Sequence, residues 1–342
     1  MRIKTAVIGC GAITRLSHLP SLLQNPKFEL VALVDPDVDA GRRMNRIFGI
    51  SAPLKTDTRD LPPTDAAIVA VPPHLHHELC TALLRKGIHV LCEKPMATDV
   101  AEGARMVHAA RAGGAVLLVG MQKQYCPNTL LLKEILKDGM LGKIKAVKLI
   151  SAVKSQWDTA NLNRFNPDHS RGGVLFESGI HWIYRVVYWF GYPKRIHYAD
   201  DRFDGVEVNA LIDATFDAYE QEISGSIYFS WDHKLHGNKI TIFGENGVAE
   251  VLEDDNSSVY VTREIHGGKK IMEIRDHAVK EKVDLFELQM DRFAECIEER
   301  NPVPETTVVA LDALRFVEEC YLHRVAVPQP WVYHGIDRVR HI

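Results

Sequence analysis

The chain has 342 residues and a formal net charge of −4, with 46% hydrophobic and 25% charged residues. Scattered basic residues and a slight acidic excess exclude a surface built to bind nucleic acid or an anionic membrane, and no apolar run reaches the ~20 residues of a membrane-spanning helix. The length predicts two domains. Six cysteines without a CxxC pair predict reduced thiols, and a strand that begins at Ile3 leaves no room for a secretory signal, so we expect a cytoplasmic protein.

Short apolar runs alternate with helical patterns in the first third of the chain, which is typical of parallel βαβ units. The expected strands cover residues 4–8, 28–35, 66–71, 89–92 and 116–119. All are apolar, as strands buried on both faces should be. Helical patterns cover residues 75–86 and 99–112. This part of the chain is therefore predicted to form a doubly wound parallel sheet.

The pattern changes after Gly120. Residues 206–216 and 223–231 alternate apolar and polar side chains, which predicts a largely antiparallel sheet covered on one face. Two late helices are expected from the apolar stripes Phe286, Met290, Phe293, Ile297 and Ala310, Leu314, Val317, Tyr321, with an N-cap for the second within residues 305–307. The fold class is thus α/β, with the doubly wound sheet in residues 1–122 and a large open, mostly antiparallel sheet in residues 123–342.

The first strand runs into a glycine turn at residues 9–14 that matches G-x-G-x-x-G in its first two glycines. Gly9 permits a tight turn, and Gly11 lets the backbone approach a pyrophosphate at the positive end of the following helix. Thr14 replaces the third glycine, which normally allows close packing of helix and strand. We expect the dinucleotide to contact Gly9, Gly11, Ala12 and Ile13.

Asp35 ends the second strand about twenty residues beyond this turn, where a carboxylate can accept hydrogen bonds from an adenosine ribose. Pro36 and Asp37 follow, and no arginine occurs before Arg42. A 2′-phosphate would meet negative charge, which favours NAD over NADP. The alternative interpretation is that Asp35 caps the next helix.

The third strand runs into Val71-Pro72-Pro73-His74-Leu75-His76-His77. Three histidines in four residues raise the question of a metal, but adjacent His76 and His77 do not have the spacing of zinc ligands, and we predict no metal site. Pro72 and His74 instead lie at the carboxyl end of a strand, where ligands of doubly wound folds bind.

Further motifs follow in order: Cys92-Glu93-Lys94-Pro95-Met96-Ala97, the segment from Gly172 to His181, and the late helix around residues 310–314. With Gly9-x-Gly11 and the Val71–His77 segment, this series resembles the Gfo/Idh/MocA family of sugar and cyclitol oxidoreductases. The resemblance covers essentially the whole chain.

The resemblance implies an NAD-binding Rossmann domain over residues 1–122 and a substrate-binding and oligomerisation domain over residues 123–342, whose sheet forms homodimers or homotetramers. It implies hydride exchange between a sugar carbon and nicotinamide, with Lys94 near the reacting hydroxyl and a cis bond between Lys94 and Pro95. The family's Asp-x-x-x-His pair maps onto Glu177 and His181. The cofactor contacts implied beyond the glycine turn and Asp35 are Val71, Pro72, His74, His77, Glu93, Lys94 and Gln122.

The chemistry of alcohol oxidation requires removal of the hydroxyl proton as hydride leaves carbon. His181 suits the acid/base role because its pKa lies near neutral pH, and the cationic Lys94 would stabilise developing alkoxide charge. Glu177 shares a helix face with His181 but is one methylene longer than the family's aspartate, so it reaches a different hydroxyl or takes part of the base role. The alternative interpretation of His181 is a structural histidine.

Weaker substrate-binding candidates follow the fifth strand and occupy a long polar loop at residues 155–171. They are Lys123, Tyr125, Trp157, Asn161, Arg164 and Asn166. Hydrogen-bonding groups beside an aromatic ring suit a sugar or polyol, and a long loop without periodicity favours a lid over an idle connection. Surface solvation is an equally good interpretation for each residue.

The predicted function is NAD-dependent hydride transfer to or from a secondary alcohol or ketone of a sugar, nucleotide sugar or cyclitol. Two alternatives remain open at this point. One is a glycosidase-type enzyme that oxidises its substrate transiently, and the other is a non-catalytic, dinucleotide-sensing regulator.

Overall fold

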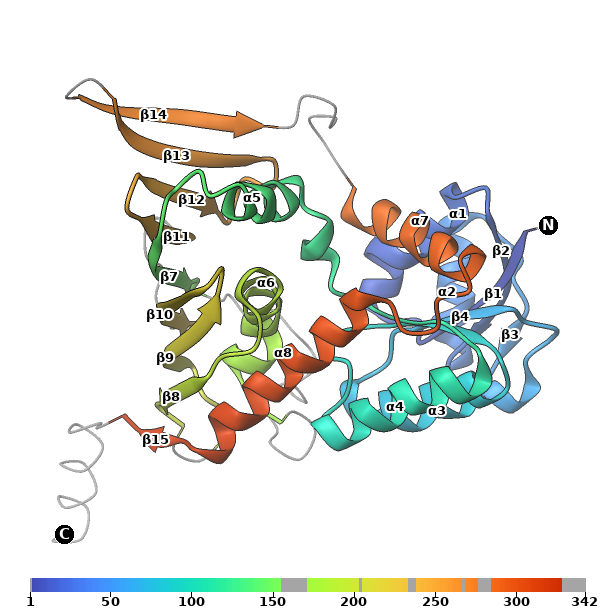
Figure 1. Cartoon of the computed structure of the whole chain (residues 1–342). Coiled ribbons are helices and arrows are strands. Elements are labelled where there is room, and N and C mark those ends of the chain that lie inside the picture. Colours follow the sequence, from blue (N-terminus) through green and yellow to red (C-terminus); the bar gives the residue numbers. More distant parts are fainter. Residues whose placement is uncertain are drawn as a thin grey trace, which may run out of the picture. The chain divides into compact units, whose positions relative to one another are not determined.

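The computed structural model describes residues 2–154, 171–202, 205–232, 238–265, 268–275 and 284–327. The candidate residues Trp157, Asn161, Arg164 and Asn166 lie outside these ranges. The chain forms two compact units, which are described separately (Figure 1). The first unit comprises Met1–Leu130 and Asp276–Arg315, and the second comprises Leu131–Arg275 and Phe316–Ile342.

The first unit is built on a six-stranded parallel sheet with strand order β3-β2-β1-β4-β5-β6. The strands are β1 (Ile3–Ile8), β2 (Phe28–Val34), β3 (Leu54–Lys55), β4 (Ala66–Val69), β5 (His89–Cys92) and β6 (Leu117–Val119). This is the order of a doubly wound fold, whose switch point lies between β1 and β4. The predicted parallel sheet is confirmed, and β3 is added to it.

The helices of this sheet are α1 (Leu19–Gln24), α2 (Val38–Phe48), α3 (His76–Arg85) and α4 (Val100–Gly113), and a π-helical turn (Thr14–His18) precedes α1. Local chemistry sets the ends of α4. The side chain of Asp99 accepts a hydrogen bond from the amide of Glu102, and Gly114 ends the helix at a φ of 62°.

Helix α7 (Leu285–Glu298) also belongs to the first unit. Its Met290 and Phe293 are buried in the same core cluster as Phe28 of β2, and the rings of Phe28 and Phe293 are stacked at 6.1 Å. The predicted division at residue 122 had placed this segment in the second domain. The structure differs because the apolar stripe of α7 completes the core beneath β2 and α1.

Helix α8 (Glu305–Leu322) begins in the first unit, and the division falls between Arg315 and Phe316. An N-cap was expected within residues 305–307, but α8 already includes these residues because it begins at Glu305. Thr307 lies in the first turn, and its hydroxyl donates to the carbonyl of Leu117 at 2.6 Å.

The second unit is built on a nine-stranded sheet with strand order β14-β13-β12-β11-β7-β10-β9-β8-β15. The strands are β7 (Ile144–Ala152), β8 (Arg195–Asp200), β9 (Asn209–Ala218), β10 (Gln221–Ser230), β11 (Lys239–Gly244), β12 (Val248–Leu252), β13 (Ser258–Ile265), β14 (Gly268–Arg275) and β15 (Val325–Ala326). The β7–β10 and β8–β15 pairs are parallel and the others antiparallel, which confirms the predicted mostly antiparallel sheet.

Helix α6 (Ile180–Phe190), preceded by a π-helical turn (Leu175–Gly179), covers one face of this sheet, and α5 (Pro127–Lys137) lies on the same side (Figure 1). Phe190 contacts Phe216 of β9 with ring centroids 5.9 Å apart. On the opposite face, Leu211 and Asp213 are exposed. The sheet is therefore covered on one side, as the period-two pattern predicts.

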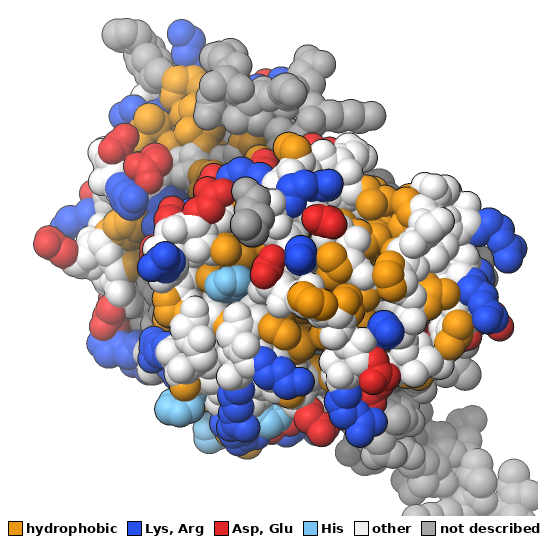
Figure 2. All heavy atoms as spheres, turned by 90° about the vertical axis from the view of Figure 1, so that its right-hand side faces the viewer, with side chains coloured by type: hydrophobic (Ala, Val, Ile, Leu, Met, Phe, Trp, Pro, Cys, Tyr) orange, Lys and Arg blue, Asp and Glu red, His pale blue; other side chains and the backbone are white. Residues whose placement is uncertain are grey.

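The surface agrees with the balanced composition. Figure 2 shows acidic and basic side chains interspersed over one face of the molecule. Among the described residues, no helix is long and apolar enough to span a membrane. The six cysteines are buried free thiols.

Candidate active site

The two glycines of the turn after β1 differ in their surroundings. Gly9 has a φ of 96°, and a Cβ atom there would lie 2.3 Å from the carbonyl oxygen of Ala70. Only glycine fits this close approach between the ends of β1 and β4. A Cβ atom on Gly11 would meet nothing within 4 Å, so the space beside its backbone is open. A pyrophosphate fits that open space.

Thr14 compensates for the missing third glycine. Its buried hydroxyl donates to the carbonyl of Gly9 at 2.6 Å, which ties the π-helical turn to the glycine turn. Leu19 and Leu22 are buried, whereas Leu16 in the π-helical turn is 64% exposed. Because the π-helical turn is wider than an α-helical one, Leu16 does not share the buried face.

Asp35 follows β2 and holds the glycine turn from the neighbouring strand. Its Oδ2 accepts from the amide of Cys10 at 2.8 Å, and its Oδ1 accepts from the amide of Asp37 at 2.9 Å. The cap of α2 is Asp37, whose side chain accepts from the amide of Asp39. The capping role considered for Asp35 therefore belongs to Asp37.

Two arginines lie near this point. Arg43 pairs with Asp37 at 3.0 Å, and Arg42 pairs with Asp39 at 2.8 Å. The hydrogen bond from Arg43 lowers the pKa of the exposed Asp37 carboxyl below its ordinary value. Two arginine side chains thus lie about one turn into α2, but each already pairs with a carboxylate.

A histidine joins the loops that follow β4 and β5, and it is His76 rather than His74 or His77. His76 is fully buried, with Nδ1 2.8 Å from the carbonyl oxygen of Pro95 and Nε2 2.9 Å from that of Val71. Burial lowers its pKa. His74 is exposed, and His77 accepts from Nε of Arg105 at 3.0 Å, so their contact with a cofactor stays a prediction.

The spacing of buried residues in α3 was a signal for His76 that the sequence analysis missed. His76, Cys80, Leu83 and Leu84 occupy one buried face at intervals of four, three and one. Among the described residues, no group of three or more histidine, cysteine, aspartate or glutamate side chains is arranged to hold a metal ion.

The Glu93-Lys94-Pro95 motif follows β5, and its Lys94–Pro95 bond is cis, which confirms that expectation. Glu93 is buried, its Oε2 accepts from the amide of Lys94 at 3.0 Å, and its Oε1 lies 2.6 Å from Nε2 of His18. A Cβ atom on Gly120 would lie 3.2 Å from Oε1 of Glu93, so glycine leaves room for the carboxylate.

Two effects act in opposite directions on the pKa of Glu93. Burial raises its pKa, but the hydrogen bond and charge of His18, and then the charge and amide of Lys94, together lower it below the ordinary value. Glu93 is therefore a buried anion behind the lysine. His18, which the sequence analysis missed, is 1% exposed and lies edge-on to Phe286 of α7 at 5.3 Å.

A 3₁₀ turn (Gln122–Tyr125) follows β6. The side-chain oxygen of Gln122 is buried and has no hydrogen-bond partner among the described residues, so it fits a ligand amide. Tyr125 lies in the same turn, and its contact with substrate stays a prediction. Its hydroxyl is buried, and its electrostatic partners Cys296 and Arg292 belong to α7. Burial raises the pKa of Tyr125.

These features share one edge of the sheet. The glycine turn, Asp35, Val71, Glu93 and Gln122 follow β1, β2, β4, β5 and β6, and the strands are parallel. Open space at Gly11, an acceptor at Asp35 and an unpaired buried amide oxygen at Gln122 together fit a dinucleotide at this edge.

The second unit carries Glu177 in its π-helical turn and His181 in the first turn of α6. Both are half-buried, and a spacing of four places them on one helical face. Gly179 lets this helix approach the sheet, since a Cβ atom there would lie 3.2 Å from the ring of Phe229. Nε1 of Trp231 donates to Oγ of Ser178 at 3.1 Å, which fixes the turn between the two candidates.

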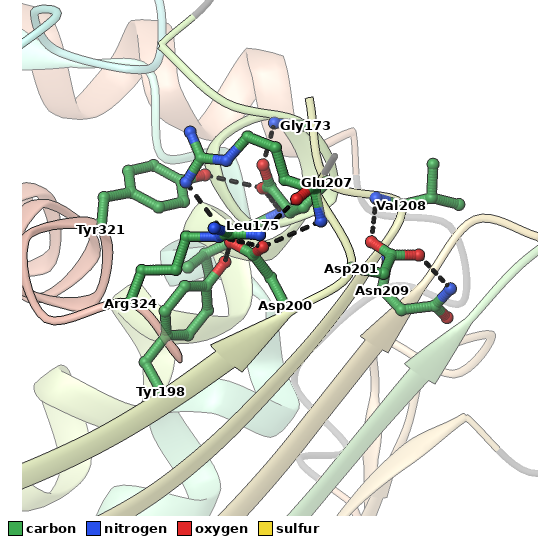
Figure 3. Close-up of polar contacts among 11 residues, drawn as sticks. Gly173, Leu175, Tyr198, Asp200, Asp201, Glu207, Val208, Asn209, Tyr321 and Arg324 are labelled. Atoms are coloured by element: carbon green, nitrogen blue, oxygen red, sulfur yellow. Dashed lines mark hydrogen bonds and ion pairs between the residues drawn. The ribbon is translucent and has the colours of Figure 1, made fainter. Parts of the chain in front are cut away.

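Steric crowding explains why glycine occupies positions 172 and 173 at the start of this helix. A Cβ atom on Gly172 would lie 2.0 Å from the hydroxyl of Tyr321, and one on Gly173 would lie 1.9 Å from the carbonyl oxygen of Glu207. Glu207 is fully buried and binds the helix start (Figure 3). The sequence analysis had assigned Glu207 to the polar side of a strand, but β9 begins only at Asn209.

Comparison with known proteins identifies the family. Residues 3–121 match the oxidoreductase family with an NAD-binding Rossmann fold, and residues 129–250 match the Gfo/Idh/MocA C-terminal domain. The chain belongs to the Gfo/Idh/MocA family. It is an NAD(P)-dependent oxidoreductase.

Relatives of this Gfo/Idh/MocA protein include two sugar or cyclitol enzymes. It is 34% identical over 232 residues, covering 64% of this chain and 68% of the relative, to scyllo-inositol 2-dehydrogenase (NADP(+)) of Bacillus subtilis. It is 28% identical over 247 residues, covering 69% and 70%, to dTDP-3,4-didehydro-2,6-dideoxy-α-D-glucose 3-reductase of Actinomadura kijaniata.

Solved structures share the fold. A 3-ketoreductase from Actinomadura kijaniata in complex with NADP and TDP-benzene has a TM-score of 0.79 at 22% identity, covering 96% of this chain and 100% of that one. An oxidoreductase domain protein from Kribbella flavida has a TM-score of 0.81 at 20% identity, covering 94% and 97%.

Proposed function

We propose that this Gfo/Idh/MocA protein transfers a hydride between NAD and a secondary alcohol or ketone of a sugar, nucleotide sugar or cyclitol. The observation that carries the proposal is the placement of Lys94 at the carboxyl edge of the parallel sheet, with the buried Glu93 anion behind it. The same edge carries the glycine turn and Asp35. The names of the relatives support the substrate class.

The dinucleotide would bind along this edge. Gly9, Gly11, Ala12 and Ile13 would receive the pyrophosphate, Asp35 the adenosine ribose, and Val71, Pro72, His74, His77, Glu93, Lys94 and Gln122 the nicotinamide half. We propose NAD as the preferred cofactor because Asp35 and Asp37 place negative charge where a 2′-phosphate would lie. NADP is the alternative cofactor, because the names of two relatives mention it and Arg43 lies beside Asp37.

The nicotinamide ring supplies a hydride acceptor or donor when it is bound. Lys94, as a cation, would bind the reacting oxygen and stabilise its alkoxide charge. His181 would take the hydroxyl proton during oxidation and return it during reduction. Glu177, on the same helical face, would orient the imidazole or bind a neighbouring hydroxyl. Lys123, Tyr125, Trp157 and Arg164 are further candidates for substrate contact, and Tyr125 is the weakest because its hydroxyl is buried beside α7.

We also propose a cytoplasmic homodimer or homotetramer formed through the exposed face of the nine-stranded sheet. Leu211, Phe243 and Ile271 are 44%, 39% and 73% exposed. By strand register they share that face. Sedimentation of the protein at several concentrations tests this assembly, and a concentration-independent monomer would contradict it.

A panel of free sugars, inositols and nucleotide sugars, each with NAD and with NADP, tests the function. Absorbance of the reduced cofactor would rise stoichiometrically with at least one hydroxyl substrate. Release of a glycoside's leaving group without net cofactor reduction would indicate the glycosidase-type reaction instead. Tight dinucleotide binding with no turnover across the panel would indicate a regulator.

A further inference from the structure

A buried carboxylate holds the start of the helix that carries Glu177 and His181. Glu207 is fully buried in the segment before β9. Its Oε2 accepts from the amide of Gly173 at 2.8 Å, and its Oε1 accepts from the amide of Leu175 at 3.1 Å (Figure 3). Its carbonyl oxygen accepts from the amide of the intervening Val174 at 3.0 Å. One residue therefore binds three successive amides.

These contacts replace an ordinary N-cap. The first amides of a helix have no partner within it and need acceptors from elsewhere. A carboxylate there also complements the positive end of the helix dipole. The bound amides belong to residues 173–175, and the amide of Glu177 donates to the carbonyl of Gly173 at 2.9 Å. The contacts of Glu207 with these three amides, called the clamp below, therefore act on the turn in which Glu177 lies.

The carboxylate is fixed from its other side by α8. The hydroxyl of Tyr321 donates to Oε1 of Glu207 at 2.7 Å. Burial, followed by the charge of Glu207, raises the pKa of Tyr321, which keeps the hydroxyl protonated and able to donate. The carboxyl group thus accepts three hydrogen bonds, from Tyr321 and from the amides of Gly173 and Leu175, which lower its pKa, but burial outweighs them and raises that pKa above its ordinary value.

Tyr321 is held in turn by residues of β8 and the loop after it. Its ring meets that of Tyr198 edge-on at 5.8 Å, and the guanidinium carbon of Arg202 lies 5.0 Å from its centroid. Asp200 binds the hydroxyl of Tyr198 and the guanidinium groups of Arg202 and Arg324 (Figure 3). Neither Tyr321 nor Glu207 can move without breaking buried contacts, so the helix start has a fixed height and rotation relative to the sheet.

We propose that Glu207 is a positioning residue that sets the location of Glu177 and His181 through the start of their helix, with Tyr321 as its support. The proposal rests on the proposed function, because the roles of Glu177 and His181 do. Gly172 and Gly173 are part of the same arrangement, because the lack of a Cβ atom at these positions allows Tyr321 and Glu207 to reach the backbone.

Glu207→Gln is the decisive variant, because the amide keeps the size of the side chain but presents an NH₂ group to donors. Tyr321→Phe removes one hydroxyl and leaves the carboxylate in place. Glu222→Gln is the matched control, since Glu222 is an exposed carboxylate of β10. Amide hydrogen exchange of residues 172–190 measures directly how firmly Glu207 holds the start of the helix. Steady-state kinetics, cofactor affinity and the pH profile of kcat/KM read its effect on the site.

For Glu207→Gln we expect faster exchange at Gly173 and Leu175 and a kcat lowered about 100-fold, as for small misplacements of reacting groups. Cofactor affinity should stay within about twofold, since the dinucleotide edge belongs to the other unit, while the pH profile should shift with the surroundings of His181. Tyr321→Phe should show the same changes to a smaller degree. Glu222→Gln should match the wild type.

Wild-type exchange and kinetics in Glu207→Gln or Tyr321→Phe would overturn the proposal. A fall in activity that only follows the folded fraction, with an unchanged pH profile, would also overturn it. If Glu207→Gln does not fold, Tyr321→Phe carries the test. If the wild type turns over none of the substrates, the proposed function is refuted. Faster exchange in Glu207→Gln would still support the clamp in that case.

Discussion

Nε2 of His18 lies 2.6 Å from Oε1 of Glu93, and both side chains are buried. This contact joins the π-helical turn after the glycine turn to the residue before Lys94. The part that would bind pyrophosphate and the part that would bind the reacting oxygen are therefore coupled through one buried pair. The pair determines whether a buried carboxylate can stay ionised behind the lysine.

Removing His18 should destabilise the first unit. His18→Leu leaves Glu93 buried without this partner, and loss of one member of a buried pair costs about 3–5 kcal/mol. His18→Gln can still donate to the carboxylate and should cost less. Urea denaturation of both variants at neutral pH measures the difference.

The destabilisation should depend on pH. Because the folded-state pKa of Glu93 lies below its ordinary value of 4.5, the stabilisation is present above pH 4.5 and is lost as the pH falls through the lower, folded-state pKa. The gap between wild type and His18→Leu should therefore narrow on acidification. A constant gap would show that the lost ring volume, not the lost partner of the Glu93 carboxylate, is responsible.

Lys94→Met should lower kcat by about 100- to 1000-fold, the usual cost of losing one group that stabilises an oxyanion. Cofactor affinity should be nearly unchanged, because the glycine turn and Asp35 are intact. Lys86→Met, at an exposed lysine after α3, is the control. An unchanged kcat in Lys94→Met would remove Lys94 from the catalytic group.

The two glycines of the turn should respond in opposite ways. Gly9→Ala places a methyl group 2.3 Å from the carbonyl oxygen of Ala70 at a φ of 96°, so it should lower the free energy of unfolding by about 2 kcal/mol. Gly11→Ala meets nothing within 4 Å, so it should fold like the wild type and bind the dinucleotide at least tenfold more weakly. Thermal melts and calorimetric titration separate the two effects. Wild-type affinity in Gly11→Ala would place the pyrophosphate elsewhere.

Cofactor preference should shift when the charge after β2 is changed. Asp35→Ser with Pro36→Arg should raise the ratio of kcat/KM for NADP to that for NAD. Asp35→Ser alone should also cost about 1 kcal/mol or more, because Asp35 accepts from the amides of Cys10 and Asp37. An unchanged ratio in the double variant would argue against a ribose contact at Asp35.

The strands of the first unit could be predicted because they are buried on both faces and read as unbroken apolar runs. The two-residue strand β3 could not, since Leu54 and Lys55 are only half-buried and show no pattern. The apolar stripe of α7 predicted a helix that faces a core. It did not say which core, because a stripe has no information about its partner.

The candidate site shows the same division. Local spacing predicted the glycine turn and Asp35, and the resemblance to the Gfo/Idh/MocA family predicted the pair Glu177 and His181, since each is a short motif. His18, Glu207 and Tyr321 were missed because their partners lie 75, 32–34 and 114 residues away. Only the folded chain brings such residues together.

The return of α7 to the first unit has a consequence for synthesis on the ribosome. Residues 2–130 contain every strand of the parallel sheet, but Met290, Phe293, Ala294 and Cys296 fill part of the core beside it. The nascent Rossmann unit therefore exposes apolar surface until α7 has emerged, after strands β7 to β14 of the second unit have already been made. A chaperone that binds exposed apolar chain would find its target during that interval, and a stop codon before residue 285 would leave the target open permanently.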